Sequence, residues 1–443
     1  MATAVTPVSD ICSAAKRASR KLARLDTAVK DAALEAIAVA LQDRAEEILA
    51  ANERDMQAGR EQEIGDALLD RLRLDHRRLA QIAGAVRQIA TLADPVGEVI
   101  DGRRLPNGLD VRKVRVPLGV VAVVYEARPN VTIDAAALCL KSGNAIVLRG
   151  SSSAEHSNAA LVQIASEAAV GAGLPAGCVS LVAGGGREEL AELATQKDSV
   201  DLIIPRGGEG LKQALQAVAT VPVIYAASGN CHVYVDASAD LDQAEAIVLN
   251  AKTQRPGVCN AAETLLVHRE IAPAFVPRIV RALGAAGVVV RGDERVLELA
   301  EDESESVGRS ADSPLEAEAS LSDSALVQAA SEEDWGTEYL ALTLAVGVVD
   351  STEQAIDHIG RYGSGHSEAI VTRDTAAARA FQLGIDAACV YVNASTRFTD
   401  GGEFGMGAEI GNSTQKLHAR GPIGLRELCT VKYLVEGDGH VRA

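Results

Sequence analysis

A cysteine in a loop is the first candidate for chemistry in this chain. Cys259 follows Pro256 and Gly257, and the cationic residues Arg255 and Lys252 precede it in the sequence. Cations near a thiol lower its pKa and make it a nucleophile. Most cysteines outside disulfides are small buried hydrophobes, but Pro and Gly mark loops whose side chains face clefts. Cys259 is therefore the leading candidate for a catalytic nucleophile.

Three loops have the composition of a nucleotide site. Each follows a short apolar run and opens a helical pattern, where backbone N–H groups bind the phosphates of a dinucleotide. An arginine at the end of one run adds a guanidinium suited to a 2′-phosphate. Glycine turns and serine N-caps are common and no GxGxxG pattern is present, so it is their recurrence that favours a nucleotide cleft. The residues in question are Arg149, Ser151, Gly184, Gly207 and Gly208.

Other catalytic patterns are missing from the sequence. HExxH, GxSxG and P-loop motifs are absent, which disfavours metal chemistry and serine hydrolysis. The seven cysteines lack CxxC spacing, so neither a zinc site nor a disulfide framework is expected. His232 could act as a base, although a hydrogen-bonded structural histidine is the commoner case. The thiol remains the best nucleophile.

Composition limits the partners and the compartment. At 443 residues the chain is long enough for two or three domains, and with only 3% aromatics its core must consist of aliphatic side chains. A net charge of -18 argues against nucleic acid and anionic membranes as partners. The N-terminus lacks the apolar region of a signal peptide, and the longest nearly apolar run, 116–125, is too short to span a bilayer. We expect a cytoplasmic protein.

The order of predicted elements indicates an α/β fold. Helical periodicity runs from 13 to 92, and two blocks follow in which short β-branched runs alternate with helical patterns. Such alternation predicts doubly wound parallel sheets, which bind ligands beyond the carboxyl ends of their strands. The strand candidates are 120–125, 145–149, 179–183, 200–204, 222–226, 233–235, 264–267, 288–290, 342–349, 369–372 and 390–392.

Two segments stand outside this alternation. Residues 98–116 alternate apolar and polar side chains around Pro106, Asn107 and Gly108, which predicts a β-hairpin. Its free edge favours oligomerisation, and 431–435 is a strand that could pair with it. The stretch at about 298–324 is rich in Glu, Asp and Ser and is expected to be a mobile acidic surface insertion.

Several longer motifs together carry a family resemblance. The chain resembles the gamma-glutamyl phosphate reductases, a branch of the aldehyde dehydrogenase superfamily. The match spans nearly the whole chain in the expected order, so it is specific. The matching stretches are 116–121 (VPLGVV), 125–132 (YEARPNVT), 147–150 (VLRG), 229–236 (GNCHVYVD), 250–260 (NAKTQRPGVCN), 363–368 (GSGHSE), 392–401 (VNASTRFTDG) and 404–411 (FGMGAEIG).

The resemblance implies an aldehyde dehydrogenase-like fold with two doubly wound α/β domains, open parallel sheets and a small β oligomerisation tongue. The NADP-binding domain would comprise 1–96 and 117–231, and the catalytic domain 232–424. The tongue would comprise 97–116 and 425–443, and the protein would form a homo-oligomer.

The resemblance also implies an activity, the NADPH-dependent reduction of L-glutamyl 5-phosphate to L-glutamate 5-semialdehyde and phosphate in proline biosynthesis. Cys259 matches the family nucleophile and would form a thioester. Glu338 falls where the superfamily binds the nicotinamide ribose. Asn230 and Asn260 are candidate donors to the oxyanion, alongside backbone N–H groups. The candidates for binding the substrate's phosphate or carboxylate are Arg128, Arg255 and His232.

One departure from the superfamily has a chemical meaning. Oxidising aldehyde dehydrogenases carry a general-base glutamate in a Glu-Leu-Gly-Gly motif, whereas residues 226–229 here are Ala-Ala-Ser-Gly. A base that activates water would hydrolyse the thioester, so a reductase gains from lacking it.

Two alternatives to this activity stay open. A CoA-acylating aldehyde dehydrogenase shares both the thiol and the missing base. The second alternative is a non-catalytic, nucleotide-binding partner of glutamate 5-kinase. That kinase is also a candidate partner of an active enzyme, because direct transfer would protect the labile acyl phosphate.

Overall fold

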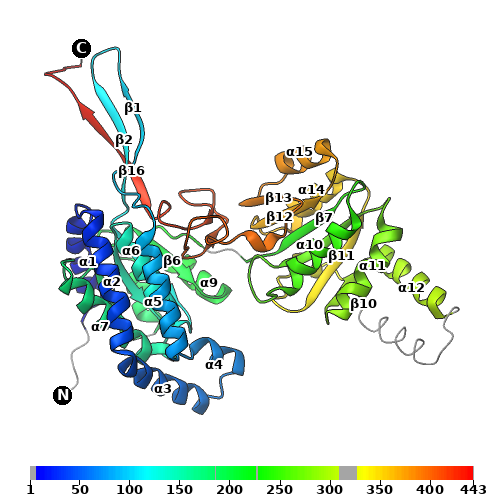
Figure 1. The fold of residues 1–443 in the computed structure, drawn as a ribbon, viewed down its shortest axis with the longest axis horizontal. Helices are drawn as coiled ribbons and strands as arrows, with labels where there is room; N and C mark the ends of the chain where they lie inside the picture. Colours follow the sequence, from blue (N-terminus) through cyan, green and yellow to red (C-terminus); the bar gives the residue numbers. More distant parts are fainter. Residues whose placement is uncertain (1–5, 185, 226–227, 309–326, 443) are drawn as a thin grey trace. The chain divides into compact units, whose positions relative to one another are not determined.

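The computed structural model describes residues 6–184, 186–225, 228–308 and 327–442. The chain divides into two compact units, each an α/β structure of the predicted class (Figure 1). Unit 1 comprises Met1–Ala226, Gly405–Gly411 and Leu417–Ala443, and unit 2 comprises Ala227–Phe404 and Asn412–Lys416.

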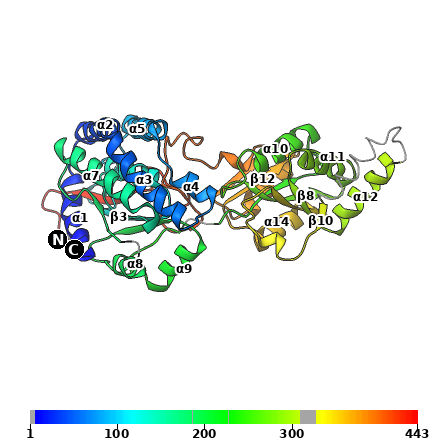
Figure 2. The ribbon, with the colours of Figure 1, turned by 90° about the horizontal axis from the view of Figure 1, so that it is seen from below.

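Unit 1 is built on a four-stranded parallel sheet with the order β5-β4-β3-β6. Its strands are β3 (Val120–Tyr125), β4 (Ala145–Arg149), β5 (Val179–Leu181) and β6 (Leu202–Arg206). Every residue of β3 and β4 is buried, as expected for aliphatic strands covered on both faces. Figure 2 shows α2, α5 and α7 on one side of this sheet and α8 and α9 on the other.

Two helices of unit 1 begin at recognisable signals. The carboxylate of Asp75 accepts the backbone N–H of Arg78 at the start of α5, and Pro129 occupies the first turn of α6. The helices are α1 (Val8–Leu22), α2 (Thr27–Asp43), α3 (Ala45–Glu61), α4 (Asp66–Leu72), α5 (His76–Thr91), α6 (Pro129–Lys141), α7 (Glu155–Gly171), α8 (Arg187–Ala194) and α9 (Glu209–Val218), with a 3-10 turn, η1 (Ser152–Ala154), before α7.

A three-stranded antiparallel sheet projects from unit 1 (Figure 1). It consists of β1 (Val99–Arg104), β2 (Asp110–Pro117) and β16 (Cys429–Glu436), with β2 in the centre. The predicted hairpin and its pairing with the C-terminal strand are thus confirmed. We call this sheet the tongue.

Unit 2 is built on a seven-stranded parallel sheet with the order β10-β9-β11-β8-β7-β12-β13. Figure 2 shows α10 and α11 on one side of the sheet and α14 on the other. The strands are β7 (Cys231–Val235), β8 (Ala262–His268), β9 (Val289–Gly292), β10 (Val327–Ala329), β11 (Thr343–Val349), β12 (Ser367–Val371) and β13 (Cys389–Val392). The helices are α10 (Leu241–Thr253), α11 (Ala272–Ala285), α12 (Glu294–Gly308), α14 (Thr352–Tyr362) and α15 (Thr375–Gly384), with 3-10 turns η2 (Asp334–Gly336) and η3 (Thr396–Phe398).

The segment after β13 contains two short two-residue strands, β14 (Asn412–Ser413) and β15 (Gly421–Pro422), which pair with each other. Parts of this segment belong to unit 1, although we expected all of 232–424 in the second domain. Gln88 donates to the carbonyl of Gly407 (3.1 Å), and Ile410 and Ile423 are buried in the core of unit 1. These contacts tie 405–411 and 417–424 to unit 1.

Two further sequence predictions need correction. Of the strand predicted at 222–226, the described residues 222–225 form a single bridge between Ile203 and Val223, because Pro222 has no N–H to donate to a ladder. Residue 226 lies outside the described residues. The first part of the acidic insertion, 298–308, is helical and belongs to α12. The remainder, 309–324, lies outside the described residues.

Candidate active site

The thiol of Cys259 lies in the turn that joins α10 to β8, at the amino end of the unit 2 sheet. All seven cysteines lie in the described part of the chain and none forms a disulfide. Six of them are buried, whereas Cys259 is partly exposed. Exposure alone therefore distinguishes Cys259 from the other six cysteines, as expected for a reactive thiol among structural ones.

The residues at the start of β7 and just before it pack against this turn. An ideal Cβ at Gly229 would lie 1.6 Å from the carbonyl oxygen of Cys259, so the two backbones touch. Cys231 donates its Sγ–H to the same carbonyl at 3.2 Å. The backbone N–H of Gly229 donates to Oε1 of Glu338 at 2.7 Å, and burial raises the pKa of Glu338. Glu338 is thus bound to Gly229, the residue that packs against the thiol turn.

The amides of Asn230 and Asn260 connect the loops around the thiol. Nδ2 of Asn230 donates to the carbonyls of Trp335 (2.7 Å) and Tyr362 (2.8 Å). Nδ2 of Asn260 donates to the carbonyls of Arg397 (3.3 Å) and Thr399 (2.9 Å). Each amide has two N–H donors, and both are used in each case. This corrects the expectation that either side chain donates to the oxyanion.

Lys252 does not act as a cation beside the thiol. Its Nζ pairs with Oε2 of Glu263 at 2.5 Å, and both side chains are fully buried. Burial raises the pKa of Glu263 to about 7, while burial lowers the pKa of Lys252 and Glu263 opposes that change. The ammonium is therefore used within the core, contrary to the sequence argument for an activated thiol.

Two arginines do lie at the thiol turn. Arg255 is exposed, and Nε of Arg397 donates to Oε1 of Gln254 at 2.8 Å. Burial and the charge of Arg255 lower the pKa of Arg397, while Asp400 and Cys259 oppose that change. Arg397 was not among the residues selected from the sequence, although it lies in one of the family stretches.

His232 is a structural histidine and not a substrate ligand. Its side chain is fully buried, and Nδ1 lies 2.9 Å from Oε2 of Glu368, which also accepts the backbone N–H of His232 (2.8 Å). His232 lies in β7, and its ring is buried between the sheet and the elements that cover it. No substrate can reach it there without opening the core.

Two of the residues predicted to bind a nucleotide, Ser151 and Gly184, line a cavity in unit 1. A cavity of about 60 Å³ at the carboxyl ends of β4 and β5 is lined by Ser151, Gly184 and Glu155. Arg149 is 7% exposed, and its Nη2 donates to the carbonyl of Gly186 at 2.6 Å. Burial lowers the pKa of this guanidinium. The hydroxyl of Ser151 and the carboxylate of Glu155 suit the hydroxyl groups of a ribose.

The third glycine loop lies elsewhere, because β3 separates β6 from β4. The backbone N–H of Gly208 donates to Oε2 of Glu126 at 3.2 Å, and a Cβ at Gly207 would lie 2.7 Å from the carboxyl carbon of Glu126. A carboxylate therefore already caps the start of α9, which disfavours a phosphate at Gly207 and Gly208. Arg128 is exposed at the residue before α6.

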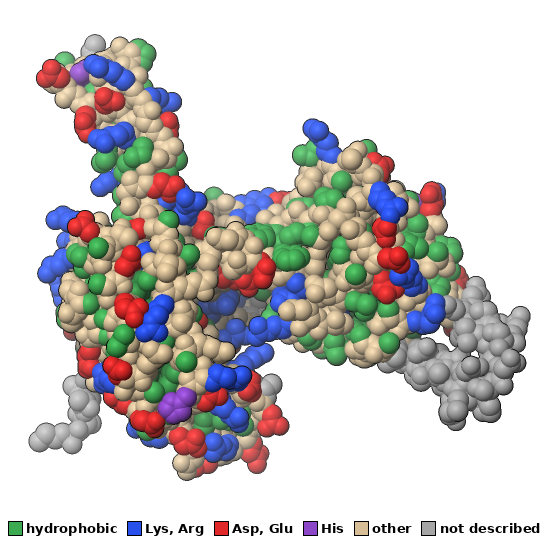
Figure 3. Space-filling model, in the orientation of Figure 1, with side chains coloured by type: hydrophobic (Ala, Val, Ile, Leu, Met, Phe, Trp, Pro, Cys, Tyr) green, Lys and Arg blue, Asp and Glu red, His purple; other side chains and the backbone are tan. Residues whose placement is uncertain are grey.

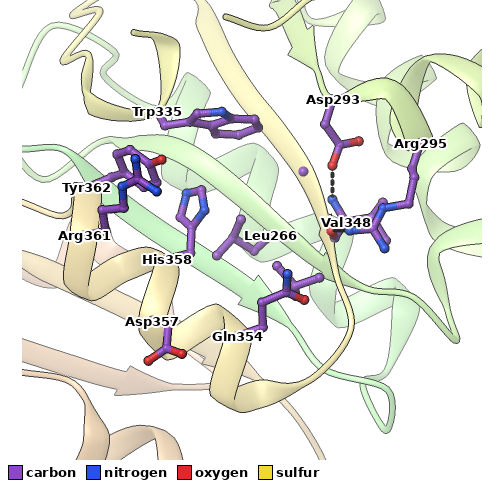
Figure 4. A pocket seen from close by; sticks show the side chains of 12 residues that line it. Leu266, Asp293, Arg295, Trp335, Val348, Gln354, Asp357, His358, Arg361 and Tyr362 are labelled. Carbon is purple, nitrogen blue, oxygen red and sulfur yellow. Dashed lines mark hydrogen bonds between the residues drawn. The ribbon is translucent and has the colours of Figure 1, made fainter. Parts of the chain in front are cut away.

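A larger cavity of about 370 Å³ lies in unit 2 and is not lined by Cys259 (Figure 4). Trp335 and Tyr362 lie at one end, and Asp293 and Arg295 at the other. Asp293 accepts the N–H of Val348 (2.8 Å), and Arg295 pairs with Asp350 (2.9 Å). The charged groups of Asp293 and Arg295 are thus paired within the protein. The lining residues are Leu266, Asp293, Arg295, Trp335, Gly347, Val348, Val349, Gln354, Asp357, His358, Arg361 and Tyr362.

Comparison with known proteins identifies the relatives of this chain. Residues 2–295 match the model of the aldehyde dehydrogenase family. The chain belongs to the aldehyde dehydrogenase family. A gamma-glutamyl phosphate reductase from Thermobifida fusca is 54% identical over 435 residues, which cover 98% of each protein. One from Heliobacterium modesticaldum is 53% identical and covers 97% of each.

Solved structures of aldehyde dehydrogenase family members support the fold. The crystal structure of gamma-glutamyl phosphate reductase from Thermotoga maritima is 44% identical and has a TM-score of 0.92, covering 99% of this chain and 100% of that one. An acetylating aldehyde dehydrogenase from Geobacillus thermoglucosidasius is 21% identical, with a TM-score of 0.67 and coverage of 98% and 97%. The second match shows the shared fold alone. The family resemblance and the predicted fold class are thus confirmed.

Motif chemistry did not assign a role to Arg397 or Glu126, although both lie in stretches that carry the family resemblance. Arg397 is far from Cys259 in the sequence, and only the path of the chain after β13 returns it to the thiol turn. Glu126 caps a helix of another βα unit. In both cases the signal is a tertiary contact between distant segments.

None of the described helices is both long and apolar enough to cross a membrane.

Proposed function

We propose that the protein catalyses the NADPH-dependent reduction of L-glutamyl 5-phosphate to L-glutamate 5-semialdehyde, with release of phosphate, in proline biosynthesis. The observation that carries this proposal is the setting of Cys259. It is a partly exposed thiol on a turn that packs against Gly229, in a chain 54% identical to a gamma-glutamyl phosphate reductase.

In the proposed reaction the thiolate of Cys259 attacks the acyl carbon, and the carbon–oxygen bond to phosphate breaks. Phosphate leaves with the electron pair, and a thioester forms. When bound, NADPH supplies the hydride that reduces the acyl group. The thiohemiacetal on Cys259 then collapses, which releases the aldehyde and restores the thiolate.

The protein's residues position these groups. Gly229 packs against the carbonyl of Cys259 and Cys231 donates to it, so the backbone that carries the thiol is fixed in position. Because the amides of Asn230 and Asn260 are used by carbonyls, backbone N–H groups of the turn are our candidates for binding the oxyanion. Substrate binding by Arg255 and Arg128 remains part of the proposal.

We propose that the nicotinamide cofactor is NADPH, with Ser151 and Arg149 near its ribose phosphate. Arg149, which directly precedes the cavity-lining residue Gly150, supplies a guanidinium that suits a 2′-phosphate and supports this preference. Glu338 is our candidate for binding the nicotinamide ribose. The N–H of Gly229 donates to Oε1 of its carboxylate, which leaves Oε2 as the oxygen that would accept from a ribose hydroxyl.

The activity can be tested in the oxidative direction with glutamate semialdehyde and NADP. Acceleration of NADPH formation by inorganic phosphate and not by coenzyme A supports the proposal. Acceleration by coenzyme A alone would favour an acylating dehydrogenase instead. No turnover with either acceptor would favour a non-catalytic partner of glutamate 5-kinase.

We also propose that the tongue mediates homo-oligomerisation with a second copy of the chain. Its outer strands β1 and β16 have free edges, and Val431, Tyr433 and Val435 are exposed on one face of β16. Figure 3 shows exposed hydrophobic side chains among charged ones along the tongue. A cytoplasmic location, which suits seven thiols without a disulfide, and glutamate 5-kinase as a partner complete the proposal.

A further inference from the structure

Arg397 is attached to both sides of the nucleophile's turn. Its Nε donates to the side chain of Gln254 at 2.8 Å, on the approach to Cys259. Its carbonyl accepts Nδ2 of Asn260 at 3.3 Å, directly after Cys259. The neighbouring Thr396 donates its hydroxyl to the carbonyl of Asn260 at 2.7 Å. The segment that carries Arg397 is therefore built into the thiol site.

A second guanidinium, that of Arg255, lies near enough to Arg397 to lower its pKa. Asp400 provides an opposing carboxylate. Of the other acids in this region, Glu263 is paired with Lys252, and burial raises the pKa of Glu338, which disfavours its charged form. Two cations at a reactive thiol, in a chain with a net charge of -18, form a local site for an anion.

We propose that Arg397 and Arg255 together bind the phosphate group of the acyl phosphate substrate at Cys259. This inference rests on the proposed function. The substrate has two anionic groups, and the phosphate is bonded to the carbon that the thiol attacks, whereas the carboxylate is at the far end of the glutamyl chain. The anion nearest to a residue attached to the thiol turn is therefore the phosphate.

Binding there also helps the chemical step. As the thioester forms, the bond between the acyl carbon and the phosphate oxygen breaks, and the electron pair moves onto the leaving phosphate. Guanidinium groups match a phosphate with paired, charge-assisted hydrogen bonds, so they stabilise this growing charge. In the reverse direction the same groups orient inorganic phosphate for attack on the thioester.

The reverse reaction separates the two anions, because phosphate and the semialdehyde are then independent substrates. We would measure KM for each with the wild type, Arg397→Gln, Arg397→Lys and Arg255→Gln. The matched control is Arg269→Gln. The side chain of Arg269 in unit 2 is 61% exposed, and its distance of 4.0 Å from Asp350 makes the ion pair a weak one. Loss of charge-assisted hydrogen bonds should raise KM for phosphate about 10- to 100-fold in both Gln variants. KM for the semialdehyde should stay close to that of the control, and Arg397→Lys should fall between.

A change in KM for the semialdehyde alone would overturn the inference and assign the arginines to the carboxylate. Unchanged KM values in both Gln variants would overturn it as well. If Arg397→Gln does not fold, the exposed Arg255 decides, since its replacement disturbs no packing. A wild type without phosphate-dependent turnover would refute the proposed function itself.

A readout without turnover separates the two failures further. Inorganic phosphate should slow alkylation of Cys259 by iodoacetamide in the wild type and in Arg269→Gln. It should give little protection in Arg397→Gln and Arg255→Gln. Equal protection in all four proteins would contradict a phosphate site at these arginines, whatever the enzyme's activity.

Discussion

Gly229 and Cys259 are in backbone contact, and a Cβ on Gly229 would lie 1.6 Å from the carbonyl oxygen of Cys259. The same Gly229 donates its N–H to Glu338. The position of the thiol is thus set by the segment that leads into β7, which begins at Cys231. No side chain fits at residue 229 without moving the nucleophile.

Gly229→Ala should lower kcat/KM by about 100-fold or more, since small misplacements of reacting groups have effects of this size. The alkylation rate of Cys259 should change as well. Gly360→Ala is the matched control, because a Cβ at this position of α14 meets no atom within 4 Å. Wild-type kinetics for Gly229→Ala would show that the turn adapts and that the contact is unimportant.

The buried pair of Lys252 and Glu263 should be required for stability. Lys252→Met leaves the Glu263 carboxylate buried without a counter-ion, with only the backbone N–H of Leu340 still donating to it at 3.3 Å, and should reduce the free energy of unfolding by about 3–5 kcal/mol. The double variant Lys252→Met/Glu263→Leu should recover most of that loss, because it removes both charges. Urea unfolding of the three proteins tests this, and a double variant no more stable than the single one would contradict it.

Most of the fold follows from periodicity and residue type. The β-branched runs predicted β3 and β4, and their burial follows from the parallel doubly wound arrangement. The prediction of a strand at 222–226 was wrong because Pro222 interrupts the ladder of backbone hydrogen bonds, a local effect that β propensity does not capture. The return of 405–411 to unit 1 depends on long-range contacts such as Gln88 with Gly407.

The candidate site was only partly accessible to the same reasoning. The Pro-Gly turn identified Cys259 because loop chemistry is local. Proximity in sequence was misleading for Lys252, whose side chain points into the core, and for His232, which lies inside the sheet. Arg397 requires knowledge of how the chain returns after β13, and no local pattern contains that information.

His366 should make the protein less stable in acid. Burial lowers its pKa to about 4, and the side chain is 1% exposed. The unfolded chain binds the proton first as pH falls from about 6.5 to 4, so the stability present above this range is lost within it, up to about 3 kcal/mol. Chemical unfolding at several pH values should show a shallower decline for His366→Gln. His76→Gln, at an exposed position, is the control, and identical slopes for all three proteins would refute the assignment.

The face of β16 that carries Val431, Tyr433 and Val435 should control assembly. Val435→Lys, alone or with Tyr433→Lys, should reduce the molar mass measured by light scattering after size exclusion, because the buried apolar contact is lost. Thr430→Lys adds the same charge on the opposite face of the strand and should leave the mass unchanged. An unchanged mass in the double variant would exclude this face from the oligomer contact.

The most direct test of covalent catalysis by Cys259 is a rapid-mixing measurement with glutamate semialdehyde and NADP in the absence of phosphate. The account predicts a burst of NADPH approaching one equivalent per chain, after which turnover stops because the thioester has no acceptor. Mass spectrometry should locate the glutamyl adduct on the peptide that contains Cys259, and added phosphate should restart turnover. Cys259→Ser should show neither burst nor adduct. A burst of equal size in Cys259→Ser, or steady turnover of the wild type without phosphate, would contradict the account.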